Sequence, residues 1–98
     1  MRFAFHPEAL DEFEDATRYY ATIQRELAQR FVASVEAAIA KLAEQPASYA
    51  IFEQDVRRCL TRVFPYAVLY TVEADYILIV AVMHCHQKPG YWRDRLAR

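Results

Sequence analysis

With 98 residues, 55% of them hydrophobic and only one of them Gly, the chain is long enough for a single hydrophobic core, and its composition excludes intrinsic disorder. No window approaches the ~18 consecutive apolar residues of a membrane span, and the N-terminus lacks the apolar region of a signal peptide, so we expect a cytoplasmic protein. The net charge of −1 and a sequence pI near 6.3 exclude a protein that coats polyanions non-specifically, and we predict one domain over residues 1–98.

The first half of the sequence predicts a short strand and two helices. Arg2–Phe5 alternates in the way of a strand. Pro7 suits the first turn of a helix, and an apolar stripe at spacings of three and four continues this helix over Pro7–Ala21. A second stripe follows over Leu27–Leu42 and is stopped by Pro46. The phase of the stripe shifts around Thr22–Arg25, which predicts a helical hairpin.

The second half predicts three strands after a connecting loop over Pro46–Gln54. The strands are expected at Arg57–Val63, Tyr66–Glu73 and Tyr76–His84. The last of them is apolar without a polar break, which is typical of a central strand covered on both faces. We therefore predict an α+β domain in which an N-terminal strand and a helical hairpin precede a three-strand antiparallel meander, with the helices on one face of the sheet.

Two groups of polar residues have simple structural interpretations. We interpret the acidic run at the start of the first helix as a solvated face, because it flanks the apolar stripe. Both cysteines are placed in strands and are expected to form a reduced pair in the core. The acidic residues are Glu8, Asp11, Glu12, Glu14 and Asp15, and the cysteines are Cys59 and Cys85.

The sequence His84-Cys85-His86 places two imidazoles on one face of a strand. A closed zinc site would need two further ligands, and only Cys59 or a carboxylate is available, so we expect neither a metal nor a cofactor. The alternative is that His84 forms a hydrogen bond near the C-terminal tail while His86 is exposed.

A further set of residues has the chemistry that RNA cleavage requires. Cleavage by the 2′-hydroxyl needs a base, a cation for the phosphorane oxygens and an acid for the leaving oxygen. The sequence supplies all three types, but the same arginines could instead meet carboxylates of a partner or face water. Tyr91 and Trp92 could stack on a base, or they could fasten the tail to the core. The set is Arg57, Arg58, Arg62, His84, Lys88 and Tyr91.

The charges are divided unequally along the chain. Residues 1–56 carry five Lys or Arg against ten Asp or Glu, whereas residues 57–98 carry seven against three. A basic C-terminal half suits an acidic partner, either protein or nucleic acid.

Taken together and in their order, several short patterns resemble the RelE/ParE superfamily of bacterial type II toxins, which are also called plasmid stabilisation proteins. The likeness runs over nearly the whole chain, and it is nearer to ParE at Phe64–Tyr66 and at His84–Trp92. The patterns are Pro7-Glu8-Ala9, Tyr19-Tyr20, the Phe31–Leu42 helix before Pro46, Val56-Arg57-Arg58, Phe64-Pro65-Tyr66 with Val68-Leu69-Tyr70, and Val82–His84 with Pro89, Tyr91, Trp92 and Arg93.

This resemblance implies a toxin that a cognate antitoxin neutralises in a hetero-oligomer. The antitoxin's C-terminal segment would fold on the toxin as a helix or an added strand, against the Arg57–Arg62 surface and the helices. Toxins similar to ParE poison DNA gyrase, so a non-enzymatic inhibitor of gyrase is the first expectation. The residues expected to bind antitoxin or target are Arg57, Arg58, Arg62, Lys88, Trp92 and Arg93.

Two other functions remain open. Toxins similar to RelE cut mRNA in the ribosome, and in that case the catalytic residues would be Arg58, Arg62, His84 and Tyr91. The sequence departs from such nucleases because Lys88 is its only lysine beyond the helices, and because a tail follows His84. The third function is that of a non-toxic family member that only binds its antitoxin.

Overall fold

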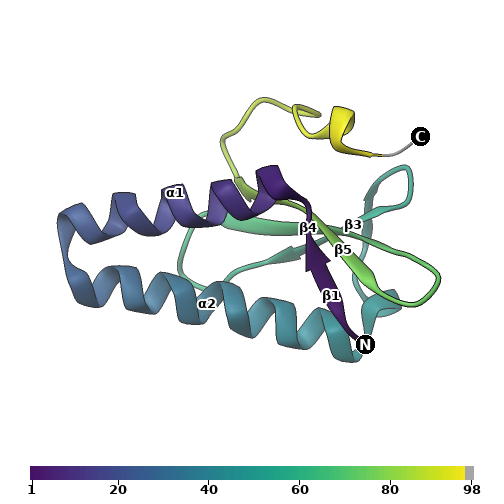
Figure 1. Cartoon of the computed structure of the whole chain (residues 1–98), viewed down its shortest axis with the longest axis horizontal. Coiled ribbons are helices and arrows are strands. Elements are labelled where there is room, and N and C mark those ends of the chain that lie inside the picture. The colour runs from purple at the N-terminus through teal and green to yellow at the C-terminus, as the bar shows by residue number, and fades with distance from the viewer. Residues whose placement is uncertain (97–98) are drawn as a thin grey trace.

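The computed structural model describes residues 1–96, which form a helical hairpin packed on a five-stranded sheet (Figure 1). In chain order the elements are β1 (Phe3–Phe5), α1 (Pro7–Ile23), α2 (Arg25–Glu44), the 3-10 turn η1 (Pro46–Ser48), β2 (Ile51–Glu53), β3 (Val56–Leu60), β4 (Tyr66–Val72), β5 (Ile77–His84) and the 3-10 turn η2 (Arg93–Arg95).

The predicted helical hairpin is confirmed. A single extended residue, Gln24, separates the two helices, and its backbone N–H donates to the Tyr20 carbonyl at 3.0 Å. At the other end of α1, the His6 Nδ1 accepts from the Glu8 N–H at 3.1 Å, and Pro7 occupies the first turn as predicted. The closed end of the hairpin projects beyond the sheet (Figure 1).

The sheet has the order β1-β5-β4-β3-β2. Strands β3, β4 and β5 form the predicted antiparallel meander, and β1 pairs with β5 in parallel. Strand β5 is an interior strand, as its unbroken apolar sequence predicted. However, β1 reaches only as far as Ile79 along β5. The edge of β5 from Val80 to His84 is therefore not covered by a strand.

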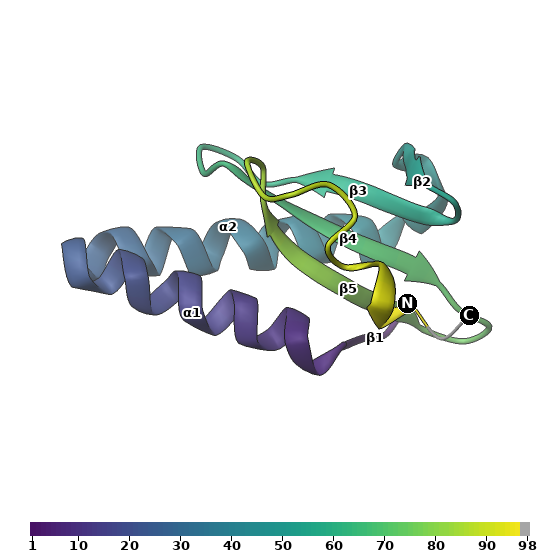
Figure 2. The same ribbon diagram turned by 90° about the horizontal axis from the view of Figure 1, so that it is seen from above.

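Both faces of the sheet are buried, by different parts of the chain. The hairpin covers one face, where Phe31 and Leu42 pack against Val68 and Ile79. On the other face lies the tail after β5, which crosses the sheet in Figure 2 and buries Trp92 completely. The tail turns at Gly90, whose φ of 74° favours glycine and where a Cβ atom would collide with the Arg93 guanidinium.

Three local predictions are wrong. Strand β3 ends at Leu60 instead of Val63, because the chain turns there and Val63 adopts a φ of 75° that no strand permits. The predicted loop over Pro46–Gln54 contains η1 and β2, a strand of three residues that is too short to reveal an alternation. Cys59 is buried as predicted, but Cys85 is exposed, because β5 ends at His84 and Cys85 begins the turn that follows.

Neither helix combines the length and the apolarity that a membrane crossing requires, as judged over residues 1–96. Over the same residues, no group of three or more His, Cys, Asp or Glu side chains is arranged to hold a metal ion.

Candidate functional site

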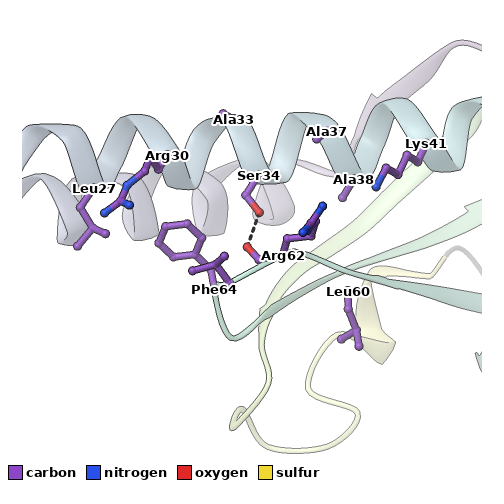
Figure 3. Close-up of a pocket in the computed structure, with 11 residues that line it drawn as sticks. Leu27, Arg30, Ala33, Ser34, Ala37, Ala38, Lys41, Leu60, Arg62 and Phe64 are labelled. Atoms are coloured by element: carbon purple, nitrogen blue, oxygen red, sulfur yellow. Dashed lines mark hydrogen bonds between the residues drawn. The ribbon is translucent and has the colours of Figure 1, made fainter.

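An apolar groove of about 330 Å³ lies between α2 and the turn that joins β3 to β4 (Figure 3). Small side chains at Ala33, Ala37 and Ala38 leave room on the helix, and Leu60 and Phe64 form the opposite wall. A hydrogen bond links α2 to the turn, because the Ser34 Oγ donates to the Arg62 carbonyl at 2.9 Å. This bond joins the two walls of the groove, α2 and the β3–β4 turn.

Three cationic side chains line this groove, and none of the described residues that line it is Asp or Glu. Arg30 and Lys41 extend from α2, and Arg62 extends from the facing turn (Figure 3). The sequence analysis found Arg62 but missed the two cations of α2, because they belong to the acidic half of the chain. Their spacing of three helical turns beside the apolar stripe is the signal that could have revealed them.

The two neighbouring arginines of β3 lie on opposite faces of the sheet. The Arg57 Nη1 donates to the carbonyls of Tyr49 and Ala47, at 2.6 and 3.2 Å, and so holds the η1 turn to the sheet. Arg58 is exposed on the other face, with its guanidinium 4.9 Å from the centre of the Phe52 ring. Arg57 is therefore engaged inside the protein, whereas Arg58 is accessible to a partner.

A depression of about 320 Å³ lies where α1, the open edge of β5 and the tail meet. His84 and Tyr91 both line it, as do two carboxylates of α1, Glu12 and Asp15. The His84 ring packs edge-on against Tyr66, with 5.1 Å between ring centres, and its Nδ1 accepts from the backbone N–H of His86. None of the described residues lining the depression is Lys or Arg.

Glu12 corrects our interpretation of the acidic run as a solvated face. Its carboxylate accepts hydrogen bonds from the Val82 N–H at 3.0 Å, from the Tyr91 hydroxyl at 2.6 Å and from two nitrogens of Arg95. The sequence pattern could not indicate this, because all its partners lie at least 70 positions away. Glu8, Asp11, Glu14 and Asp15 are exposed, as predicted.

The hydrogen bond to Glu12 also holds the Tyr91 side chain in place. Burial raises the pKa of its hydroxyl well above the ordinary value, and the hydrogen bond to Glu12 raises this pKa further. The hydroxyl therefore stays protonated and donates its hydrogen bond to the Glu12 carboxylate.

The remaining candidates belong to the tail. Trp92 is fully buried, and the Arg93 guanidinium bonds to the Glu53 carboxylate, with 2.8 Å between Nη2 and Oε1. This bond lowers the pKa of the Glu53 carboxyl. Lys88 is exposed. Tyr91 and Trp92 thus fasten the tail to the core, which is one of the two roles considered for them.

The candidates for RNA cleavage do not form one site. His84 and Tyr91 share the depression, Arg62 lines the groove, and Arg58 stands on the outer face of β3. The chain therefore offers two separate surfaces: a basic apolar groove and an acidic aromatic depression.

Comparisons with known proteins agree with this architecture. The family described as the ParE toxin of the type II toxin-antitoxin system, parDE, matches residues 3–89. Among solved structures, a chain of the "Chromosomal ParDE TA system from P. aeruginosa" has a similar fold, with a TM-score of 0.75 and 16% sequence identity over 86% of this chain and 95% of that one. No curated protein sequence matches. Because the family match spans most of the chain, the protein belongs to the ParE toxin family of type II toxin-antitoxin systems.

Proposed function

We propose that this protein is a toxin that inhibits DNA gyrase without catalysing a reaction, and that a cognate antitoxin keeps it silent. Membership of the ParE family supports the toxin role. The gyrase target rests on the resemblance, because toxins similar to ParE act on that enzyme. The antitoxin corresponds to the acidic partner that the basic C-terminal half of the sequence suggests.

The groove beside α2 suits the antitoxin. Its apolar lining favours a hydrophobic segment, and the positive charges of Arg30, Lys41 and Arg62 favour acidic residues at that segment's borders. Arg58 lies over the Phe52 ring on the other face of the sheet and does not line this groove. We therefore assign antitoxin binding to the groove, with Arg30, Lys41 and Arg62 as charged contacts.

The observation that favours gyrase inhibition over RNA cleavage is the lining of the depression. His84 and Tyr91 meet there beside the carboxylates Glu12 and Asp15, with no cation among the described lining residues. The exposed Asp15 carboxylate disfavours a phosphodiester there, and because none of the described lining residues is Lys or Arg, the phosphorane oxygens would lack the cation that stabilises them. The arginines that could supply this cation, Arg58 and Arg62, lie elsewhere.

The test is induced expression of this chain alone in bacteria, followed by mapping of transcript ends and of plasmid topology. We expect intact messages together with altered supercoiling or DNA-damage signalling. With purified protein, we expect gyrase to lose its supercoiling activity at stoichiometric excess of the toxin. Codon-positioned breaks in translated messages would overturn the proposal in favour of a ribosome-dependent nuclease, and harmless expression would favour a non-toxic antitoxin-binding protein.

Variants at the candidate catalytic residues sharpen this comparison. His84→Ala and Arg62→Ala should leave gyrase inhibition in vitro within a few-fold of the original, because neither side chain is assigned to chemistry. If the original protein cuts messages and either substitution abolishes both the cutting and the toxicity, the nuclease function is correct instead.

A further inference from the structure

Arg95 occupies an internal binding site for a guanidinium group, which has three components. The carboxylate of Glu12 on α1 accepts from both terminal nitrogens of Arg95, at 2.8 and 3.0 Å. The Val80 carbonyl on the open edge of β5 accepts from Nη1 at 3.1 Å. The ring of Tyr91 lies against the guanidinium, 5.0 Å from its carbon to the ring centre. A carboxylate, an edge carbonyl and an aromatic face thus bind this cation.

A second carboxylate on α1 and a second carbonyl on the open edge of β5 lie next to the pair that binds Arg95. Asp15 follows Glu12 by three residues, so it lies on the same face of α1 and lines the depression. Val82 follows Val80 by two residues, and its N–H donates to Glu12 at 3.0 Å. Within a strand, the N–H and C=O of one residue point to the same side, so the Val82 carbonyl also faces α1 across the open edge.

The depression also has aromatic rings, the third component of the site that binds Arg95. Tyr66 and His84 line the depression with their rings 5.1 Å apart, and Tyr19 of α1, which is 60% exposed, lines it as well. Here no Lys or Arg of the described chain lines the cavity, unlike the site that Arg95 fills. Its volume of about 320 Å³ leaves room for a side chain from another molecule.

We propose that this depression binds an arginine side chain of a protein partner. A guanidinium is planar, carries five N–H donors and stacks on aromatic rings, so it can meet the Asp15 carboxylate, the Val82 carbonyl and the tyrosine faces together. Asp15 also pairs with Arg18 on its own helix, but both side chains are about 70% exposed, at 71% and 69%. Such a surface pair contributes little, and an incoming arginine can replace it.

The inference rests on the proposed function only in that the partner is the toxin's target. The depression is separate from the groove assigned to the antitoxin's apolar segment. Its acidic lining suits a basic anchor, whereas the basic groove suits an acidic antitoxin, so we assign the arginine to the target.

The site can be tested by ¹H–¹⁵N NMR titration of the full chain with N-acetyl-arginine amide. The controls are the citrulline analogue, which has the same shape without the charge, and inorganic phosphate. We expect saturable shifts of the amides of Tyr19, Val82 and His84 with the arginine compound alone. Asp15→Asn should weaken this binding by up to about fivefold, as expected for an exposed charge. Glu14→Gln, which removes an exposed charge next to it, should leave the binding unchanged.

Three results would overturn the site: equal shifts with citrulline, equal effects of Asp15→Asn and Glu14→Gln, or shifts of the same amides with phosphate. These outcomes are independent of the toxin's target. A chain that inhibits gyrase but does not respond to the arginine compound would refute this site alone. A chain that binds the arginine compound but leaves gyrase and bacterial growth unaffected would refute the proposed function alone.

Discussion

Glu12 and Arg95 form a two-pronged ion pair that joins α1 to the C-terminal tail, although 83 positions of sequence separate them. The Arg95 side chain is only 8% exposed and that of Glu12 22%. The same carboxylate also binds the Val82 N–H on the edge of β5 and the Tyr91 hydroxyl. One side chain therefore holds a helix, a strand edge and the tail together.

Removing this carboxylate should destabilise the protein. Glu12→Ala leaves the buried Arg95 guanidinium with only the exposed Glu8 carboxylate, 3.8 Å from its Nε, and losing the main partner of a buried charge in this way costs about 3 kcal/mol. The measurement is the free energy of unfolding in urea. Glu14→Ala on the same helix is the matched control, because Glu14 is exposed, and it should change stability by about 0.5 kcal/mol or less. Equal urea midpoints for the two variants would contradict the structural role of Glu12.

Trp92 should stabilise the tail through apolar burial and not through hydrogen bonding. It is fully buried against the outer face of the sheet, and its Nε1 has no hydrogen-bond partner among residues 1–96. Trp92→Ala should therefore cost about 3 to 5 kcal/mol, whereas Trp92→Phe should cost about 1.5 kcal/mol or less. If Trp92→Phe is as damaging as Trp92→Ala, the indole N–H has a role that this packing does not explain.

The sequence was sufficient for the main elements because their signals are local. An apolar stripe of period 3.6 identified both helices, and the unbroken apolar run of β5 identified an interior strand. Elements whose signal is short were missed: β2 has three residues, and the end of β3 depends on the backbone turn at Val63. The spacing of apolar residues therefore could not predict β2 or the end of β3.

The candidate sites were harder to predict than the fold, because they combine residues from distant segments. The sequence pattern places Glu12 on a solvated helix face, but in the fold the tail positions Arg95 against it. Arg57 and Arg58 are adjacent in sequence, and only the register of β3 decides that one is engaged internally and the other is exposed. The groove needed the packing of α2 beside the β3–β4 turn, which no pattern in the sequence specifies.

Stability should fall at alkaline pH because of Tyr70. Burial raises the pKa of its hydroxyl to about 12, and the hydroxyl donates to the Pro46 carbonyl at 2.6 Å. The unfolded chain loses this proton near pH 10, so the contribution is complete below that pH and is lost as pH rises toward 12. Over this interval the free energy of unfolding should fall by about 1.4 kcal/mol per pH unit for this group.

Urea unfolding at pH 8, 10 and 11 would measure this slope. Tyr70→Phe should be less stable than the original at pH 8, because the Pro46 carbonyl loses its donor, but its stability should fall less between pH 10 and 11. Tyr19→Phe is the control at an exposed tyrosine and should retain the original slope. An unchanged slope in Tyr70→Phe would show that other groups cause the alkaline loss.

A carboxylate placed in the groove should weaken antitoxin binding. Ala37 is exposed on α2 and lines the groove, so Ala37→Glu both fills the space and opposes an acidic partner without disturbing the core. We expect at least about a tenfold loss of affinity for the cognate antitoxin by calorimetry, with little change in melting temperature. Ala40→Glu makes the same change three residues later on the same helix, away from the groove, and should bind normally. Equal affinities of the two variants would place the antitoxin elsewhere.

Val63 should be replaceable by glycine with a gain in stability. Its φ of 75° is unfavourable for a β-branched residue, and its side chain is 94% exposed, so little packing offsets the strain. Val63→Gly should therefore stabilise the fold by about 1 kcal/mol and raise the melting temperature by about 5 °C. Val72→Gly is the matched control, because Val72 is also exposed but lies in β4, where glycine costs about 0.5 to 1 kcal/mol. The comparison isolates the backbone, since both substitutions remove the same side chain from the surface. A fall in melting temperature for Val63→Gly similar to that for Val72→Gly would mean that the turn after β3 carries no such strain.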